Sequence, residues 1–199
     1  MSETSQREAP KPADVARTWW AELQDYHQDG SRNLRADRAV RARLRRADRD
    51  KALTEEAVLA LYRRLTPEGE SGFREWRMDL ALRLALVLVH VREDVSTDDN
   101  GIRKSFARQL GRANFSDPIE EARLKPLRFQ RLLAARDETE IVQGFRRAVD
   151  LAGNKANVRD LAGLLLNWKS EKTRARFAFD YFAAGNAAPK TDAEPMLSA

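Results

Sequence analysis

The side chains best suited to chemistry in this sequence are arginines, and they are concentrated in one segment. Residues 31–51 hold nine basic and three acidic residues, a net charge of +6, so the rest of the chain contributes −1 to the total of +5. A guanidinium group is planar and always charged, and it can bind two phosphate oxygens at once. The segment therefore has the composition of a surface that follows the phosphates of a nucleic acid.

Helical spacing predicts that these arginines form a row. At about 100° per residue, four of them share one sector of a helix, and Arg35 and Arg46 lie beside it. The apolar residues Val40, Leu44 and Ala47 lie opposite. A charged helix face is usually only solvated, but such faces normally mix both signs, and this row has almost no acids. The candidate nucleic-acid contacts on this helix are Arg38, Arg41, Arg45, Arg46 and Arg49.

Basic residues recur in the second half of the chain. Arg108 shares a helix face with other cations, Arg146 and Arg147 lie beside apolar helical positions, and a basic run follows Trp168. Together with the Arg-rich helix they predict a binding groove built from both halves. The candidates from the basic run are Lys169, Lys172 and Arg174.

Residue patterns typical of enzymes are missing from the sequence. There is no Cys, and His27 and His90 are the only histidines, which leaves little for a metal centre or a thiol nucleophile. The glycines form no phosphate-binding loop, and no serine has a nucleophile-elbow context. We therefore expect a protein that is not an enzyme and binds no cofactor and no metal.

Apolar periodicity predicts an all-α fold of two small helical bundles in one elongated subunit. The expected helix after residue 73 is apolar nearly all round and should be central. Asp14 and Thr54 are predicted N-caps, and Pro126 is predicted to interrupt a helical run. The expected helices cover residues 14–28, 33–47, 54–65, 73–91, 102–110, 117–125, 129–136, 141–151, 158–168 and 173–182.

The turn-rich stretch around residues 94–101 is the best candidate for a domain boundary. We expect an N-terminal bundle over residues 13–97 and a C-terminal bundle over residues 98–183, with flexible tails at 1–12 and 184–199. The N-terminus has no signal peptide, and the most apolar stretch is too short and too charged to span a membrane. The protein is expected to be soluble and cytoplasmic.

Over residues 15–182 the sequence resembles the CasB family, the small subunit of the type I-E CRISPR surveillance complex, Cascade. No single motif is specific, but their order and spacing together are. They are an early Trp helix, the end of the Arg-rich helix, and five C-terminal segments. The matching segments are residues 19–23, 44–47, 105–110, 127–133, 145–149, 164–168 and 176–182.

The resemblance implies an all-α subunit without catalytic activity. Two copies are expected to lie head to tail in the complex, beside the backbone subunits and the large subunit, and to help hold target DNA after it pairs with the guide RNA. Replacing duplex DNA by a hybrid is nearly balanced in energy, so backbone contacts can stabilise such an R-loop without reading sequence. The family's basic positions match Arg45, Arg46, Arg108, Arg128, Arg146, Arg147 and Lys172.

Two other functions remain open at this point. The chain could be a purely structural adaptor whose basic faces dock on guide RNA or on acidic protein surfaces. It could also be an α-helical DNA-binding regulator, although the sequence shows no base-reading element.

Overall fold

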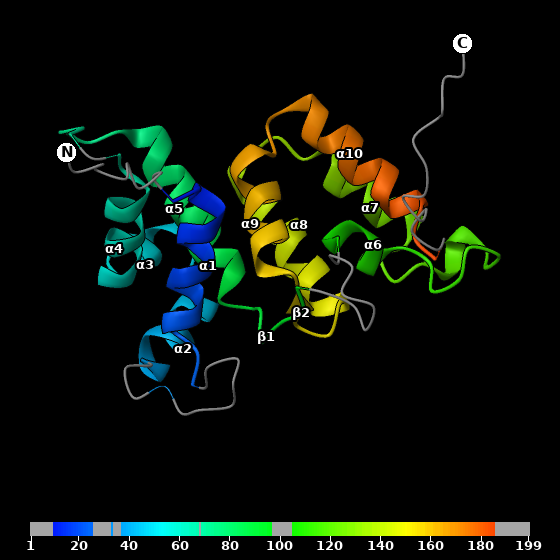
Figure 1. Cartoon of the computed structure of the whole chain (residues 1–199), viewed down its shortest axis with the longest axis horizontal. Helices are drawn as coiled ribbons and strands as arrows, with labels where there is room; N and C mark the ends of the chain where they lie inside the picture. The colour runs from blue at the N-terminus through cyan, green and yellow to red at the C-terminus, as the bar shows by residue number, and fades with distance from the viewer. Residues whose placement is uncertain (1–9, 26–32, 34–36, 68, 97–104, 186–199) are drawn as a thin grey trace, which may run out of the picture.

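A computed structural model describes residues 10–25, 33, 37–67, 69–96 and 105–185. In these residues the regular structure is almost entirely helical, and the all-α prediction is confirmed (Figure 1). Strands β1 (Glu93–Asp94) and β2 (Lys155–Ala156) pair in parallel. The helices are α1 (Pro12–Glu22), α2 (Arg38–Arg46), α3 (Arg49–Leu53), α4 (Glu56–Leu65), α5 (Glu75–Leu88), α6 (Phe106–Leu110), the 3-10 helix η1 (Ile119–Glu121), α7 (Pro126–Ala134), α8 (Glu138–Leu151), α9 (Val158–Asn167) and α10 (Glu171–Phe182).

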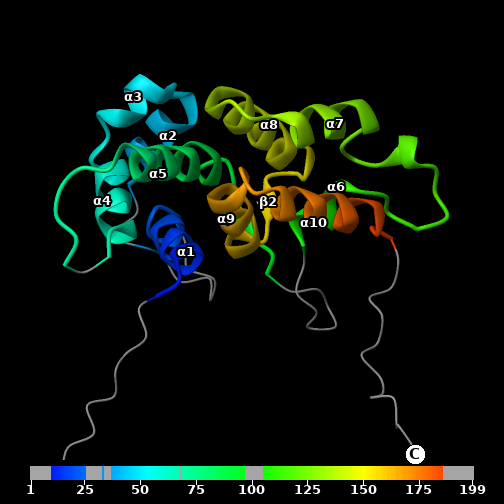
Figure 2. The ribbon, with the colours of Figure 1, turned by 90° about the horizontal axis from the view of Figure 1, so that it is seen from above.

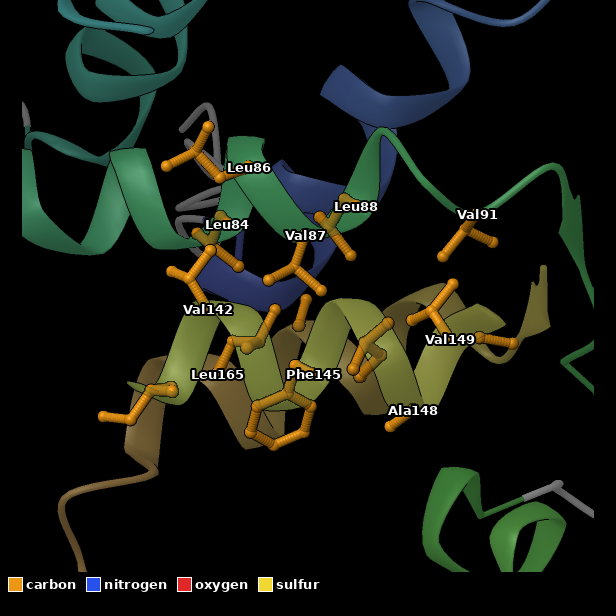
Figure 3. Packing of buried hydrophobic residues seen from close by; sticks show 14 of the residues in the cluster. Leu84, Leu86, Val87, Leu88, Val91, Val142, Phe145, Ala148, Val149 and Leu165 are labelled. Carbon is orange, nitrogen blue, oxygen red and sulfur yellow. The ribbon is translucent and has the colours of Figure 1, made fainter. Parts of the chain in front are cut away.

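Helix α5 lies at the centre of the fold, as its apolar pattern predicts. Every residue from 81 to 89 is buried, and helices α1, α2, α3, α4, α8 and α9 all pack against α5. This part of the helix has no solvent-facing side, so its sequence loses the usual polar stripe. The close-up in Figure 3 shows its side chains interlocking with those of α8 and α9.

The two halves of the chain share one hydrophobic core. Helix α1 packs on α9, and α5 packs on α8 and α9, so the main contacts run across the predicted domain boundary. A single cluster of buried residues extends from Ala16 to Tyr181. The boundary itself, at residues 97 and 98, lies outside the described residues, as do residues 1–9 and 186–199 of the predicted tails. The division into two bundles stays a prediction.

The predicted continuous Arg-rich helix is wrong. Helix α2 ends at Arg46, and α3 begins at Arg49 after a two-residue break. Each helix starts at an aspartate: Asp37 accepts a hydrogen bond from the backbone N–H of Val40, and Asp48 accepts one from Lys51. Side-chain acceptors at this position satisfy the free N–H groups of a first turn. Arg49 therefore belongs to a different helix from the other four arginines.

Three further local predictions are wrong. Thr54 ends α3 and donates its hydroxyl to the Lys51 carbonyl, whereas Glu55 precedes α4. Pro126 starts α7 at its first turn, where the missing N–H costs nothing. Helix α1 begins at Pro12, before the predicted Asp14 cap. By contrast, the predicted end of α8 at Gly153 and Asn154 is confirmed, and both residues have positive φ angles.

One buried arginine links three helices across the middle of the molecule. The side chain of Arg83, on α5, is 2% exposed and forms an ion pair with Glu138 at the start of α8. Two hydrogen bonds of Arg83 go to Glu138. A third hydrogen bond runs from its Nη1 to the Leu165 carbonyl on α9, at 2.6 Å. A charge buried this deeply is tolerated only when it is paired and hydrogen-bonded.

Removing the carboxylate partner of Arg83 should destabilise the protein strongly. We expect Glu138→Ala to lower the free energy of unfolding by about 3 kcal/mol, because it leaves a buried guanidinium without its counter-charge. Lys169 binds the same carboxylate from a side chain that is 65% exposed, so Lys169→Ala is the matched control and should cost less than about 1 kcal/mol. Urea unfolding measures both. Equal losses would contradict the central role of the Arg83 pair.

The same ion pair should make stability depend on acid pH. Burial acts to raise the pKa of Glu138, but hydrogen bonds and charge from Arg83 and Lys169 outweigh it and hold the pKa below its ordinary value of 4.5. Its contribution is therefore present above pH 4.5 and is lost as pH falls through the lowered pKa. Glu138→Gln should flatten the acid limb of a plot of unfolding free energy against pH. An unchanged acid limb would contradict this assignment.

Candidate nucleic-acid interface

The arginines of α2 do not form the free row that the helical wheel predicts. Arg38 and Arg41 both bind the carboxylate of Asp25, at 2.8 and 2.7 Å. Arg41 also donates to the side-chain oxygen of Gln24 at 3.1 Å. On α3, Arg49 forms an ion pair with Asp79 of α5. Most of these guanidinium groups are therefore already engaged within the fold.

Two other candidates, Arg45 and Arg146, bind carbonyl groups at the end of α5. The last carbonyls of a helix have no partner within it, and its C-terminal end favours a positive charge. Arg45 donates its Nε to the Val89 carbonyl at 2.7 Å. Arg146, on α8, donates to Leu86 at 2.8 Å and to the Ala47 carbonyl, just after α2, at 2.9 Å. Burial lowers the pKa of both arginines from its usual range.

Arg46, Arg128 and Arg147 remain exposed on one side of the molecule. None of them makes an ion pair or side-chain hydrogen bond within the part of the chain that the structure describes. Figure 2 shows the helices that carry them, α2, α8 and α7, along one side. Arg131 belongs to the same surface but was missed in the sequence. The signal was its spacing of three residues from Arg128, which places both on one face of α7.

Two clefts adjoin on this side. The first lies between α2, α3, α5 and α8 and brings together the candidates Arg46, Arg49 and Arg146. It lies between the two halves, as the predicted binding groove would, but its four arginines face four carboxylates. The second cleft lies between α7 and α8 and is lined by Arg128, Arg131 and Arg147 with two carboxylates. Gln143 lines both clefts, so they form one continuous surface.

We use the name α7–α8 face for the surface formed by Arg128, Arg131 and Arg147. Its cations outnumber its acids by one, whereas the charges of the first cleft cancel. The α7–α8 face is therefore the part of this surface on which cations are in excess and have no partner among the described residues.

The remaining candidates lie around α10 and α6. Lys172 is exposed in the first turn of α10, whereas Lys169 binds Glu138. Arg174 donates hydrogen bonds to the carbonyls of Trp168 and Lys169, the two residues that follow α9. Arg108, on α6, lies 3.9 Å from Asp180. Of these four, Lys172 is the one that makes no ion pair or side-chain hydrogen bond within the described residues.

The described residues contain no group of three or more acidic or histidine side chains that could hold a metal ion. None of the helices in that part of the chain is both long and apolar enough to cross a membrane. A search of curated proteins and a search of solved structures each returned no match.

A family model does match the chain. The model described as CRISPR-associated protein Cse2 (CRISPR_cse2) covers residues 40–182, which is most of the sequence. The chain therefore belongs to the Cse2 family, the CasB family of Cascade small subunits that its motifs resemble. Membership makes it a subunit of a CRISPR Cascade complex.

Adjacent arginines on α8 should respond differently to substitution. Arg146→Ala leaves two carbonyl groups without their donor, so we expect the free energy of unfolding to fall by about 2 kcal/mol. Arg147→Ala removes an exposed side chain with no partner among the described residues and should change it by less than about 0.5 kcal/mol. Urea unfolding of the two single variants measures the difference. Equal effects would show that Arg146 does not stabilise the end of α5.

Proposed function

We propose that this chain is a non-catalytic small subunit that binds nucleic-acid backbones without sequence preference and stabilises the R-loop of its Cascade complex. The observation that carries the proposal is the α7–α8 face, where three exposed arginines exceed the nearby acids. Arg46 extends it across Gln143, and Lys172 is a further candidate contact.

The chemistry of this face suits a phosphate backbone better than a base sequence. A guanidinium group binds phosphate oxygens in a fork geometry, and such contacts fix position without reading bases. Opening a duplex against a guide is nearly balanced in energy, so a few backbone contacts can tip it. The expected affinity is weak and falls steeply with salt.

The proposed partners are the guide RNA, the target DNA, the other Cascade subunits and a second copy of the chain, in the cytoplasm. Exposed aromatic side chains support protein contacts at both ends of the elongated molecule. Phe73 and Trp76 are more than half exposed near the start of α5, and Phe179 and Phe182 are equally open near the end of α10. Figure 1 places these segments at opposite ends.

The same aromatic side chains favour a second candidate function, that of a purely structural adaptor. In that case the arginines would contribute to assembly rather than to DNA opening. The two functions differ in what a variant complex does: an adaptor with a damaged basic face fails to join the complex, whereas an R-loop-stabilising subunit joins it and opens DNA poorly.

Reversing charge on the α7–α8 face should impair DNA opening. We expect a complex carrying Arg128→Glu with Arg147→Glu to keep its normal composition by gel filtration. R-loop formation should fall about tenfold or more, because two proposed phosphate contacts become repulsive. The opened strand is measured by its reactivity to permanganate. The matched control is Arg63→Glu with Arg74→Glu, two exposed arginines on α4 and before α5.

Three outcomes separate the possibilities. Normal R-loop formation by the Arg128 and Arg147 variant would overturn the proposed function. Loss of the subunit from the complex would favour the adaptor. Equal impairment by the control pair would show that overall charge, rather than this face, is responsible.

A further inference from the structure

A third cleft lies at an edge of the molecule away from the α7–α8 face. It is formed where residues after α1, helix α2 and the segment from α5 to β1 come together (Figure 1). Arg41 and Arg45 lie one turn apart on α2, and Arg92 follows α5. The cleft is lined by Gln24, Asp25, Arg41, Arg45 and Arg92.

Asp25, the carboxylate that lines this cleft among the described residues, is already paired on both oxygens. One oxygen of Asp25 accepts from Arg38 at 2.8 Å and the other accepts from Arg41 at 2.7 Å. The hydrogen bond from Arg38, followed by that from Arg41, holds the pKa of this carboxyl below its ordinary value in spite of some burial. Asp25 is therefore ionised at neutral pH, and each of its oxygens already accepts a hydrogen bond from another arginine.

Arg45 and Arg92 lack any carboxylate partner in the described residues. Arg45 uses its Nε on the Val89 carbonyl, and its two terminal nitrogens make no hydrogen bond within that part of the chain. The side chain of Arg92 is exposed and has no partner there either. Burial, and then repulsion by Arg41 and Arg92, lowers the pKa of Arg45, and attraction to Asp25 only partly opposes this. The cleft thus concentrates positive charge that the fold does not neutralise.

Charge distinguishes this cleft from the other two. Its three arginines face one carboxylate, an excess of two, whereas the α7–α8 face has an excess of one and the cleft between the halves has none. Two guanidinium groups with free N–H donors suit the two unbridged oxygens of a phosphodiester. Resting on the proposed function, we propose that Arg45 and Arg92 bind one backbone phosphate of a nucleic-acid strand, beside Arg41, whose terminal nitrogens are already bound to Gln24 and Asp25.

This site makes α2 a helix with cations on two sides. Arg46 lines the cleft toward α8, and Arg45, the preceding residue, lines the cleft toward Arg92. Successive residues on a helix diverge by about 100°, so one short helix can contact phosphates on both sides. Arg92 contributes to this site from a segment that the Arg-rich pattern does not include.

The test uses Arg92→Gln in the full-length protein, because this exposed side chain contributes nothing to folding within the described contacts. Binding of labelled single-stranded DNA, single-stranded RNA of the same sequence and duplex DNA is measured by anisotropy between about 50 and 200 mM salt. Arg63→Gln is the control for loss of one exposed charge. Arg128→Gln with Arg147→Gln reports on the α7–α8 face separately.

We expect Arg92→Gln to weaken binding of at least one probe about fivefold and to reduce its salt slope by about one, as for the loss of one phosphate contact. The probe affected identifies whether the strand is DNA or RNA. Affinity and slope equal to those of Arg63→Gln with every probe would overturn the site. If Arg92→Gln weakens binding and the Arg128 and Arg147 variant does not, the result supports this site. The same result would overturn the proposed role of the α7–α8 face.

Discussion

The structure depends on how the buried end of α5 is completed. A helix enclosed on every side cannot satisfy its last carbonyl groups with water, so other parts of the chain must supply donors. Arg45 binds Val89, Arg146 binds Leu86, and the indole N–H of Trp20 binds the Val91 carbonyl at 3.1 Å. These donors come from α2, α8 and α1. The need for donors at one helix end therefore fixes how helices from both halves of the chain pack together.

This constraint divides the arginines into two groups with different roles. Arg83 pairs with a carboxylate and Arg146 completes a helix end, and these two guanidinium groups stabilise the fold and face inward. Those left over, such as Arg128 and Arg147, lie on the surface and are available to a ligand. The net charge of +5, and its concentration in residues 31–51, give no hint of this division. It follows from which side of a helix meets the core.

Much of the fold could be predicted from the sequence, because periodicity alone indicates that a helix such as α5 is buried. The roles of individual arginines could not. Arg45 and Arg46 are neighbours of the same type, and only the position of the end of α5 decides that Arg45 binds a helix-end carbonyl while Arg46 does not. Asp48 is a favoured N-cap residue and so was a signal for the break after α2. An aspartate among arginines is equally consistent with an ion pair, so the signal was ambiguous. Arg92 is isolated in the sequence and gains its significance only from the tertiary packing that brings α2 beside it.

The central claim is that inward-facing arginines stabilise the fold whereas exposed arginines are available to a ligand. Chemical modification of arginine by phenylglyoxal, followed by mass spectrometry, tests this claim most directly. In the free protein, the account predicts fast modification of Arg128, Arg131 and Arg147 and slow modification of Arg146. In the assembled complex holding target DNA, the first three should become protected and Arg146 should stay slow. Fast modification of Arg146 in the free protein, or unchanged reactivity of Arg128 and Arg147 on the R-loop, would contradict the account.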